Sequence, residues 1–188
     1  MTSSATRLSR RGVFQAFAAT ALAAAPTYSA AAGFLRGAGD VRRIKMYSGR
    51  TGEHIDMIYW IEGKYISDAL KEVNYFMRDW RQDKAAKMDT RTVDIIAATR
   101  NLLDTDSAFM LLSGYRTPQT NAMLRARSSG VARRSLHMEA KAADLRCNGR
   151  SVGQISRAAA SIAAGGVGRY SGSNFVHVDC GVVRTWGR

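Results

Sequence analysis

The chain has 188 residues, 46% of them hydrophobic, which suffices for one domain with an ordinary core and a targeting sequence. Its 28 lysines and arginines outnumber 15 aspartates and glutamates, so the formal net charge is +13. The two cysteines, Cys147 and Cys180, are too few for a disulfide-dependent miniprotein. Their wide separation also excludes a CxxC redox motif or zinc knuckle.

Residues 1–32 differ in composition from the rest of the chain. They contain Arg7, Arg10 and Arg11 but no acidic residue, continue through an apolar run over 13–26 and end in small residues. This order is typical of a cleavable signal peptide, and the run is too short for a stable bilayer span of about 20 residues. The segment 9–14 resembles the twin-arginine export motif. An ordinary Sec signal or an uncleaved anchor is the alternative interpretation.

Removal of residues 1–32 takes away three arginines and leaves a net charge of +10. Such a charge attracts polyanions without identifying one of them. For an exported chain without a nucleic-acid recognition motif, the carboxylate-rich cell wall and anionic lipid surfaces are better candidates than nucleic acid. We therefore predict a periplasmic protein with no nucleic-acid partner and no stable membrane span after signal removal.

Helical and strand-like patterns follow a flexible, Gly-rich lead-in over 33–40. Thr117 and Ser151 are capping residues at two predicted helix starts, and Pro118 suits a first helical position. The first predicted elements are a hairpin of strands 43–47 and 55–61, a helix with apolar residues from Leu70 to Trp80 and a helix over 92–103. A strand over 109–112, a helix from 118 to about 127, a strand over 142–146 and a helix over 151–164 follow. The last element is a hairpin over 165–188, with its turn at 171–174 and its returning strand at 175–179. Because helices and hairpins segregate, the expected class is α+β, a small antiparallel sheet with flanking helices.

Two of the three histidines, His137 and His177, lie close in sequence to aspartates. His54 stands apart in the first hairpin, and we interpret it as a surface or packing residue. His137 and Asp144 are seven positions apart, so bonds of about 2 Å to one zinc ion require a turn over 138–141. Asp144 lies on the strand that follows, and His177 and Asp179 share one face of the last strand.

Two adjacent strands could therefore bring three nitrogen and oxygen ligands to one point and leave a fourth position for water. Spacing alone is modest evidence, since a neighbouring histidine and aspartate are more often a surface pair or a satisfied core group.

The ordered motifs around these residues strengthen the zinc hypothesis. Segments 113–117, 135–137, 142–144 and 175–179 together resemble the zinc D-Ala-D-Ala metallopeptidase and hedgehog superfamily. Within it, the chain is most similar to the YcbK-like murein endopeptidases over roughly 43–186. The resemblance implies a hedgehog/DD-peptidase-like fold for the predicted zinc peptidase domain over 41–188, and export to act on peptidoglycan stem peptides.

The same resemblance assigns roles to single residues. It implies that His137, Asp144 and His177 bind Zn²⁺. It also implies that Arg116 holds the substrate carbonyl or the developing oxyanion, whereas a structural ion pair is the alternative for that arginine. Tyr115, Gln119 and Asn121 are candidates for lining the cleft, although an amphipathic helix would explain them equally.

This chain departs from the family pattern at two positions. Ala140 stands where the family often has glycine. Asn174 stands where the carboxypeptidase branch has a catalytic glutamate, and an amide does not accept a proton from water. Asp179 is then the nearest acid that could act as the base or hold His177, and both roles are weighed equally. Glu139 is a weaker candidate and fits a solvated turn residue.

The predicted activity is zinc-dependent hydrolysis of peptide cross-links in murein. A D-amino-acid carboxypeptidase of the same fold is one alternative, and an inactive wall-binding protein is another, which the missing glutamate at Asn174 supports. Cys147 and Cys180 each lie three residues after a predicted ligand, so strand alternation directs both thiols away from the metal. We interpret them as a candidate disulfide rather than as zinc ligands.

Overall fold

The computed structural model describes residues 40–128 and 130–187. The predicted signal peptide over 1–32 and all but the last residue of the lead-in over 33–40 lie outside these residues. Within the described part, no helix combines the length and hydropathy needed to cross a membrane.

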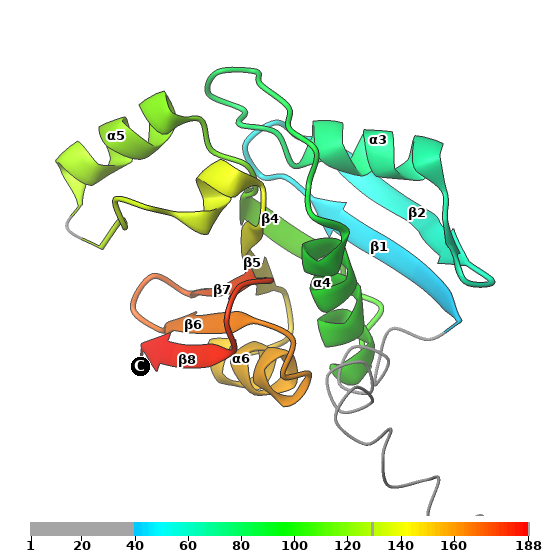
Figure 1. Cartoon of the computed structure of the whole chain (residues 1–188). Helices are drawn as coiled ribbons and strands as arrows, with labels where there is room; N and C mark the ends of the chain where they lie inside the picture. The colour runs from blue at the N-terminus through cyan, green and yellow to red at the C-terminus, as the bar shows by residue number, and fades with distance from the viewer. Residues whose placement is uncertain (1–39, 129, 188) are drawn as a thin grey trace, which may run out of the picture. The chain divides into compact units, whose positions relative to one another are not determined.

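The secondary structure follows the predicted order closely (Figure 1). Helix α5 and strand β7 have the predicted bounds, whereas α3 ends four residues before Trp80. The elements are β1 (Val41–Tyr47), β2 (His54–Ile61), β3 (Lys64–Tyr65), α3 (Ser67–Phe76), α4 (Thr90–Leu102), β4 (Phe109–Ser113), α5 (Pro118–Arg127), the 3-10 helix η1 (Leu136–Glu139), β5 (Ala142–Cys147), α6 (Val152–Ser161), β6 (Gly166–Tyr170), β7 (Phe175–Asp179) and β8 (Arg184–Gly187).

The predicted caps start two of these helices. The Thr117 hydroxyl accepts a hydrogen bond from the backbone N–H of Thr120 at 3.1 Å, and Pro118 follows it at the first helical position. At the start of α6, Ser151 and Gln154 form a reciprocal capping box. Both devices satisfy backbone N–H groups that have no partner inside their helices.

The eight strands form one mixed sheet in the order β3-β2-β1-β4-β5-β7-β6-β8. Most neighbours are antiparallel, but β1 pairs with β4, and β6 with β8, in parallel. The predicted small antiparallel sheet is therefore wrong in size and in strand direction, while the α+β class is confirmed. Parallel pairing joins strands that are distant in the sequence, and residue alternation within one strand does not reveal it.

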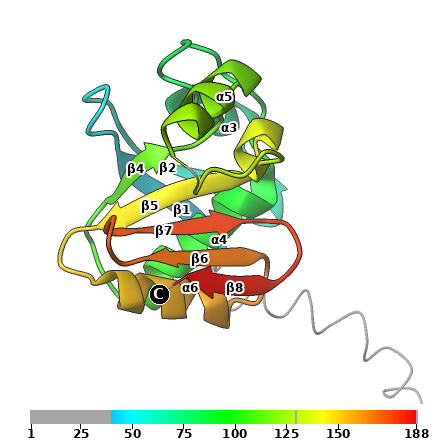
Figure 2. The same ribbon diagram turned by 90° about the vertical axis from the view of Figure 1, so that its left-hand side faces the viewer.

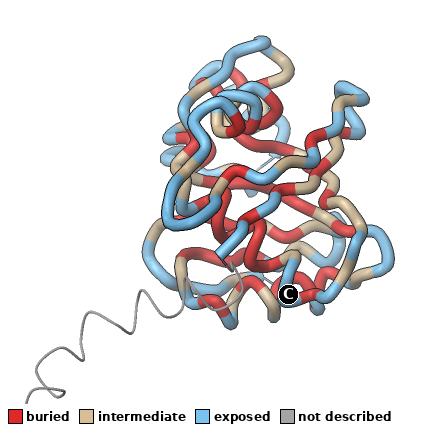
Figure 3. Tube along the Cα trace, turned by 90° about the vertical axis from the view of Figure 1, so that its right-hand side faces the viewer, coloured by how far each residue is buried: buried red, intermediate tan, exposed pale blue. Residues whose placement is uncertain are grey.

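Helices cover the two ends of the sheet differently. Helix α3 packs on β2, α4 contacts β1 and β7, and α6 contacts β5, β6 and β7. In Figure 2, α4 and α6 lie behind β5, β7, β6 and β8, so the front face of these four strands is free of both helices. Figure 3 shows buried residues along the strands and exposed ones mainly in the loops.

Alternation along β5 and β7 separates a core face from an open face. Leu145 of β5 and Val178 of β7 are fully buried in the hydrophobic core, together with Ile155 of α6. Since neighbouring residues in a strand point to opposite faces, Asp144 and His177 project from the other face of the sheet.

Both cysteines belong to the hydrophobic core, and neither forms a disulfide. The backbone N–H of Cys180 bonds to the carbonyl of Lys141 just before β5 begins, whereas Cys147 is the last residue of β5. Six residues of extended chain separate these points by about 20 Å, and a disulfide needs Cα atoms within about 7 Å. The candidate disulfide is therefore wrong, although both thiols point away from the open face as predicted.

Candidate metal centre

The side chain of His137 is placed by a tight turn. Helix η1 ends at Glu139, the capping residue Ala140 has a left-handed backbone (φ 54°, ψ 34°), and the chain then enters β5. The predicted turn over 138–141 is thus present. His137 is 2% exposed, and its Nδ1 lies 2.7 Å from the carbonyl oxygen of Gly114. Because a carbonyl only accepts, Nδ1 carries a hydrogen, and in the neutral ring Nε2 keeps its lone pair.

Asp144 and His177 lie directly opposite each other in the register of β5 and β7. The Nδ1 atom of His177 is 3.0 Å from Oδ1 of Asp144, and its Nε2 atom is 3.0 Å from Oδ2 of Asp179. Both ring nitrogens therefore face carboxylate oxygens. Such a ring either carries two protons or shares a cation with one of the carboxylates.

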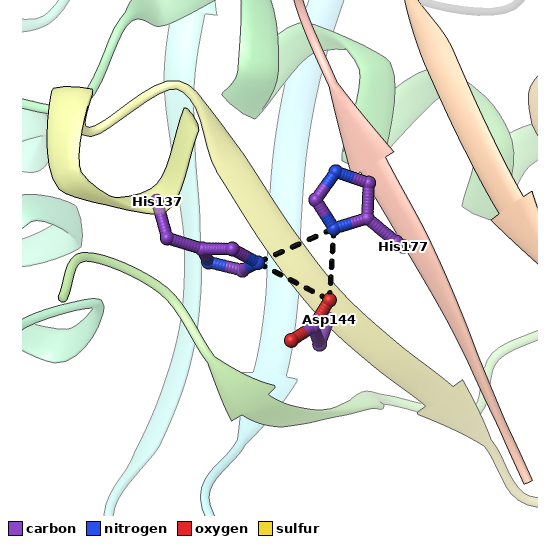
Figure 4. Close-up of side chains that lie close together, drawn as sticks. All are labelled: His137, Asp144 and His177. Carbon is purple, nitrogen blue, oxygen red and sulfur yellow. Dashed lines mark hydrogen bonds and ion pairs between the residues drawn. The ribbon is translucent and has the colours of Figure 1, made fainter. Parts of the chain in front are cut away.

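Three potential ligand atoms converge on the open face of the sheet (Figure 4). His137 Nε2, Asp144 Oδ1 and His177 Nδ1 are separated from one another by 3.0–3.3 Å. Ligand atoms about 2.0–2.1 Å from a tetrahedral zinc ion lie about 3.3 Å apart, so the residues fit this metal. Among residues 40–128 and 130–187, no other group of three such side chains has its ligand atoms within 4.8 Å.

Burial and neighbouring charges shift the pKa values of these three residues in opposite directions. Burial lowers the pKa of His137 more than Asp144 raises it, which favours the neutral ring that a metal requires. Burial alone would raise the pKa of Asp144, but His137 and then His177 outweigh it and hold that pKa well below its ordinary value. Hydrogen bonds to Asp144 and Asp179 raise the pKa of His177 against the effect of its burial.

Asp179 is fully buried, and both of its carboxylate oxygens are occupied. Oδ1 accepts hydrogen bonds from the backbone N–H groups of Gly166 and Gly181 and from Arg184 Nη1, at 2.9–3.1 Å. Oδ2 faces His177 Nε2 at 3.0 Å and Arg184 Nη2 at 2.8 Å. Burial would raise the pKa of Asp179, but hydrogen bonds from His177 and Arg184 outweigh it and lower that pKa. This geometry favours a role for Asp179 in holding His177 rather than in accepting a proton from water.

Arg116 contacts the cluster of His137, Asp144 and His177, the candidate ligand cluster, from the loop after β4. Its Nη2 atom forms an ion pair with Asp144 Oδ2, and its Nε atom donates to Ser113 Oγ at 2.7 Å. The loop is held by the buried Asp79, whose Oδ2 accepts from both the N–H and the hydroxyl of Thr117 at 2.8 Å. Arg116 thus forms a structural ion pair through Nη2, and it also lines the adjoining cleft.

The ligand cluster opens into a cleft of about 700 Å³. Its floor is formed by residues of β5, β7, β6 and β8, and one wall by residues 128, 130–132 and 134–137. Tyr115, Gln119 and Asn121 were candidates for this lining, and none of them belongs to it. Asn121 supports the wall from behind, because its Nδ2 donates a hydrogen bond to the carbonyl of the lining residue Ala132 at 3.1 Å.

The three other polar residues singled out by sequence lie outside the ligand cluster. Asn174 is exposed and has a left-handed backbone (φ 53°) in the turn between β6 and β7. Asparagine tolerates this conformation better than glutamate does, which gives a physical reason for the amide at this position. Glu139 is a solvated turn residue paired with Lys141, as expected, and His54 is exposed and stacks on Tyr47.

Arg184 and Trp186 of β8 are among the cleft residues that the sequence did not predict. The Trp186 ring lies 5.3 Å from the ring of His177, centroid to centroid, and its Nε1 donates to Tyr170 Oη at 2.9 Å. Alternation shows only that Arg184 and Trp186 share one face of their strand, as Gly166 and Gly168 do on β6; their place beside His177 follows from the strand register.

Comparison with known proteins agrees with the motifs. A family model described as peptidoglycan L,D-endopeptidase MepK matches residues 36–186. The peptidoglycan L,D-endopeptidase MepK of Escherichia coli (strain K12) is 42% identical over 136 residues, which cover 72% of this chain and 75% of that protein. A probable peptidoglycan L,D-endopeptidase MepK of Haemophilus influenzae is 38% identical over 137 residues, which cover 72% of this chain and 74% of that protein.

Proposed function

Because the chain belongs to the peptidoglycan L,D-endopeptidase MepK family, we propose that it is a zinc-dependent endopeptidase that hydrolyses peptide cross-links in peptidoglycan. The observation that carries the zinc assignment is the triangle of His137 Nε2, Asp144 Oδ1 and His177 Nδ1, with sides of 3.0–3.3 Å. When bound there, zinc supplies an activated water and polarises the scissile carbonyl.

The protein's own residues would prepare this site before substrate arrives. The carbonyl of Gly114 and the carboxylate of Asp179 each hold one nitrogen of a histidine and turn the other toward the shared point. Arg116 neutralises the Asp144 oxygen that does not face the histidines, and it lines the cleft where an oxyanion would need a donor. In this proposal Arg116 stabilises the oxyanion, and Asp179 acts by orienting His177.

The charge of the cleft wall supports a substrate rich in carboxylates. No acidic residue occurs between Asp106 and Glu139, a stretch that contains five arginines. Two of these, Arg116 and Arg134, line the cleft; Arg134 is exposed, and no ion pair joins it to another described residue. Stem peptides of peptidoglycan carry free carboxylates, so they complement this wall. The N-terminal signal features support export, and hence a periplasmic location.

An inactive wall-binding protein is the second candidate, and one observation favours it. Among the described residues that line the cleft, the acids are Asp144 and Asp179, and both are already engaged by histidines and arginines. A D-amino-acid carboxypeptidase is the remaining alternative within the same chemistry. Family membership favours the endopeptidase over both.

The test is to measure zinc in the purified protein and to incubate it with defined cross-linked muropeptides. We expect about one zinc ion per chain, since the described part holds a single candidate centre, and cleavage at the cross-link. The His137→Ala variant should lose both zinc and cleavage. A metal-free wild type, or cleavage that survives His137→Ala, contradicts the proposal, and retained zinc without cleavage favours the wall-binding protein. Release of only a terminal D-amino acid favours the carboxypeptidase.

A further inference from the structure

Strand β8 lies at the edge of the sheet, yet two of its side chains reach the candidate ligand cluster. Strand β6 separates β8 from β7, so β8 and β7 are about 10 Å apart, two strand spacings. Arg184 nevertheless bonds to Asp179, and Trp186 packs against His177. Both side chains must therefore cross β6.

Two glycines of β6 lie at the crossing points. In the strand register, Arg184, Gly166 and Asp179 form one row across the sheet. Trp186, Gly168 and His177 form the next row on the same face. The second row continues to Asp144 of β5, so it leads directly to the ligands.

A side chain at either glycine would block this arrangement. A Cβ atom added at Gly168 would lie 2.6 Å from Cε2 of Trp186, and one added at Gly166 would lie 2.5 Å from Oδ2 of Asp179. Such distances are far below van der Waals contact. The two glycines thus form a shallow trough across β6, in which the side chains of Arg184 and Trp186 lie.

The contacts made through this trough fix His177 from two directions. Arg184 donates through Nη1 and Nη2 to the two oxygens of Asp179, which in turn holds His177 Nε2 at 3.0 Å. The Trp186 ring contacts the His177 ring at a tilt of 53° and is itself held by Tyr170. The side chain of Arg184 also lies over Trp186, 4.7 Å from the ring centroid.

We infer that Arg184 and Trp186 are positioning residues, which lie across the Gly166–Gly168 trough and hold His177 in the orientation that binds the metal. The inference rests on the proposed zinc site and adds to it the residues of β8 that orient one ligand. Partners that orient a metal-binding histidine typically contribute about 10- to 100-fold to metal affinity.

The test compares zinc dissociation constants, measured by competition with a chromophoric chelator, in the purified protein and its variants. Arg184→Ala should weaken zinc binding about tenfold, and Arg184→Lys should restore part of the loss because it keeps one donor to Asp179. Gly168→Ala should also weaken binding, because its methyl group displaces Trp186 although no side chain of the network itself is substituted. The visible spectrum of the cobalt-substituted protein should change in the same variants, because it reports the coordination geometry.

Matched controls separate positioning from general destabilisation. Arg43 makes the same two-pronged contact to Asp56 on the surface, so Arg43→Ala should leave zinc affinity unchanged. A Cβ atom at Gly172 meets nothing within 4 Å, so Gly172→Ala is the control for Gly168→Ala. If Gly168→Ala fails to fold, Trp186→Phe tests the same contact with a smaller change, and a weaker affinity is again expected.

The outcomes distinguish this inference from the proposed function. A wild type that binds no zinc overturns both. A wild type that binds zinc, together with Arg184→Ala and Trp186→Phe variants of unchanged affinity and unchanged cobalt spectrum, overturns the role of β8 alone.

Discussion

Two clusters of buried charged residues in the described part of the chain differ in what surrounds them. In the N-terminal half, Asp94 of α4 is 2% exposed and pairs with Arg42 of β1 at 2.8 Å. The hydroxyls of Tyr59 and Tyr65 donate to the same carboxylate at 2.9 and 2.7 Å, and the Arg42 guanidinium lies over the ring of Trp60. The charges of this cluster cancel within the protein.

In the C-terminal half, the cluster around Asp144 opens into the cleft. Two histidine nitrogens and a carboxylate oxygen lie close to one another there, and either a shared cation or a doubly protonated His177 makes this arrangement compatible. Arg116 and Arg184 neutralise the outer oxygens of the two aspartates. Burial of charge alone therefore does not mark a candidate functional site, whereas convergence of potential ligand atoms at an open face does.

The largest expected effect on folding comes from the closed cluster. Asp94→Ala leaves Arg42 buried without its partner, which should lower the free energy of unfolding by about 3–5 kcal/mol. Urea denaturation in the presence of a chelator measures this loss without a contribution from zinc. Asp56→Ala, which breaks the exposed pair with Arg43, is the control and should cost about 1 kcal/mol or less. Equal losses in the two variants would contradict a structural role for the Asp94 cluster.

The second-largest expected effect is the increase in stability on zinc binding, which should depend on the Asp144 cluster and not on the Asp94 cluster. Zinc at a free concentration of about 100 times its dissociation constant should add about 2.7 kcal/mol to the stability of the wild type. Asp144→Ala removes a proposed ligand and should abolish this increment, whereas a folded Asp94→Ala variant should keep it. Thermal melts with and without zinc measure the increment. An increment that persists in Asp144→Ala would show that zinc binds elsewhere.

A smaller effect concerns Asp79, which is buried like Asp94 but lies beside the loop of Arg116. Burial would raise the pKa of Asp79, but the threonine hydroxyls and backbone N–H groups around it outweigh burial and lower that pKa. A group with a lowered folded pKa stabilises the protein above its unfolded pKa of about 3.9, and this stabilisation is lost as the pH falls through the folded value.

Asp79→Asn should therefore cost about 1–3 kcal/mol at neutral pH, as expected when buried donors lose a charged acceptor. The difference between wild type and variant should stay constant down to about pH 5 and shrink in more acidic solution. Urea denaturation over a pH series measures it. A difference that grows on acidification would contradict the direction of the pKa shift.

The sequence predicted local features better than pairings between distant segments. Caps such as Thr117, the turn after His137 and the bounds of β7 depend on neighbouring residues, and they are confirmed. The three predicted ligands are brought together, although their binding of zinc stays a prediction. The parallel partners of β1 and β6 were missed because they depend on crossovers between segments.

Site residues were missed for the same reason. The position of Arg184 against Asp179 depends on the register of three strands, which alternation within one strand does not determine. The candidate pairing of Cys147 with Cys180 failed likewise, since the register places them at opposite ends of β5.

The smallest expected effect concerns the backbone that carries His137. Ala140 and Ala163 both have a left-handed backbone with φ 54°, but Ala140 is 3% exposed and Ala163 is exposed. A non-glycine residue pays about 1–2 kcal/mol for this conformation, while glycine costs about 0.4–1 kcal/mol through the unfolded chain. Ala163→Gly should therefore stabilise the protein by about 0.5–1 kcal/mol.

Ala140→Gly relieves the same strain but also removes a buried methyl group, worth about 0.8 kcal/mol, so its net effect should be close to zero. Urea denaturation of both variants measures the difference, which isolates the contribution of the Ala140 methyl group to packing under η1. A gain in Ala140→Gly as large as that in Ala163→Gly would mean that this methyl group contributes nothing. The alanine at position 140 would then lack the packing role that offsets its backbone strain.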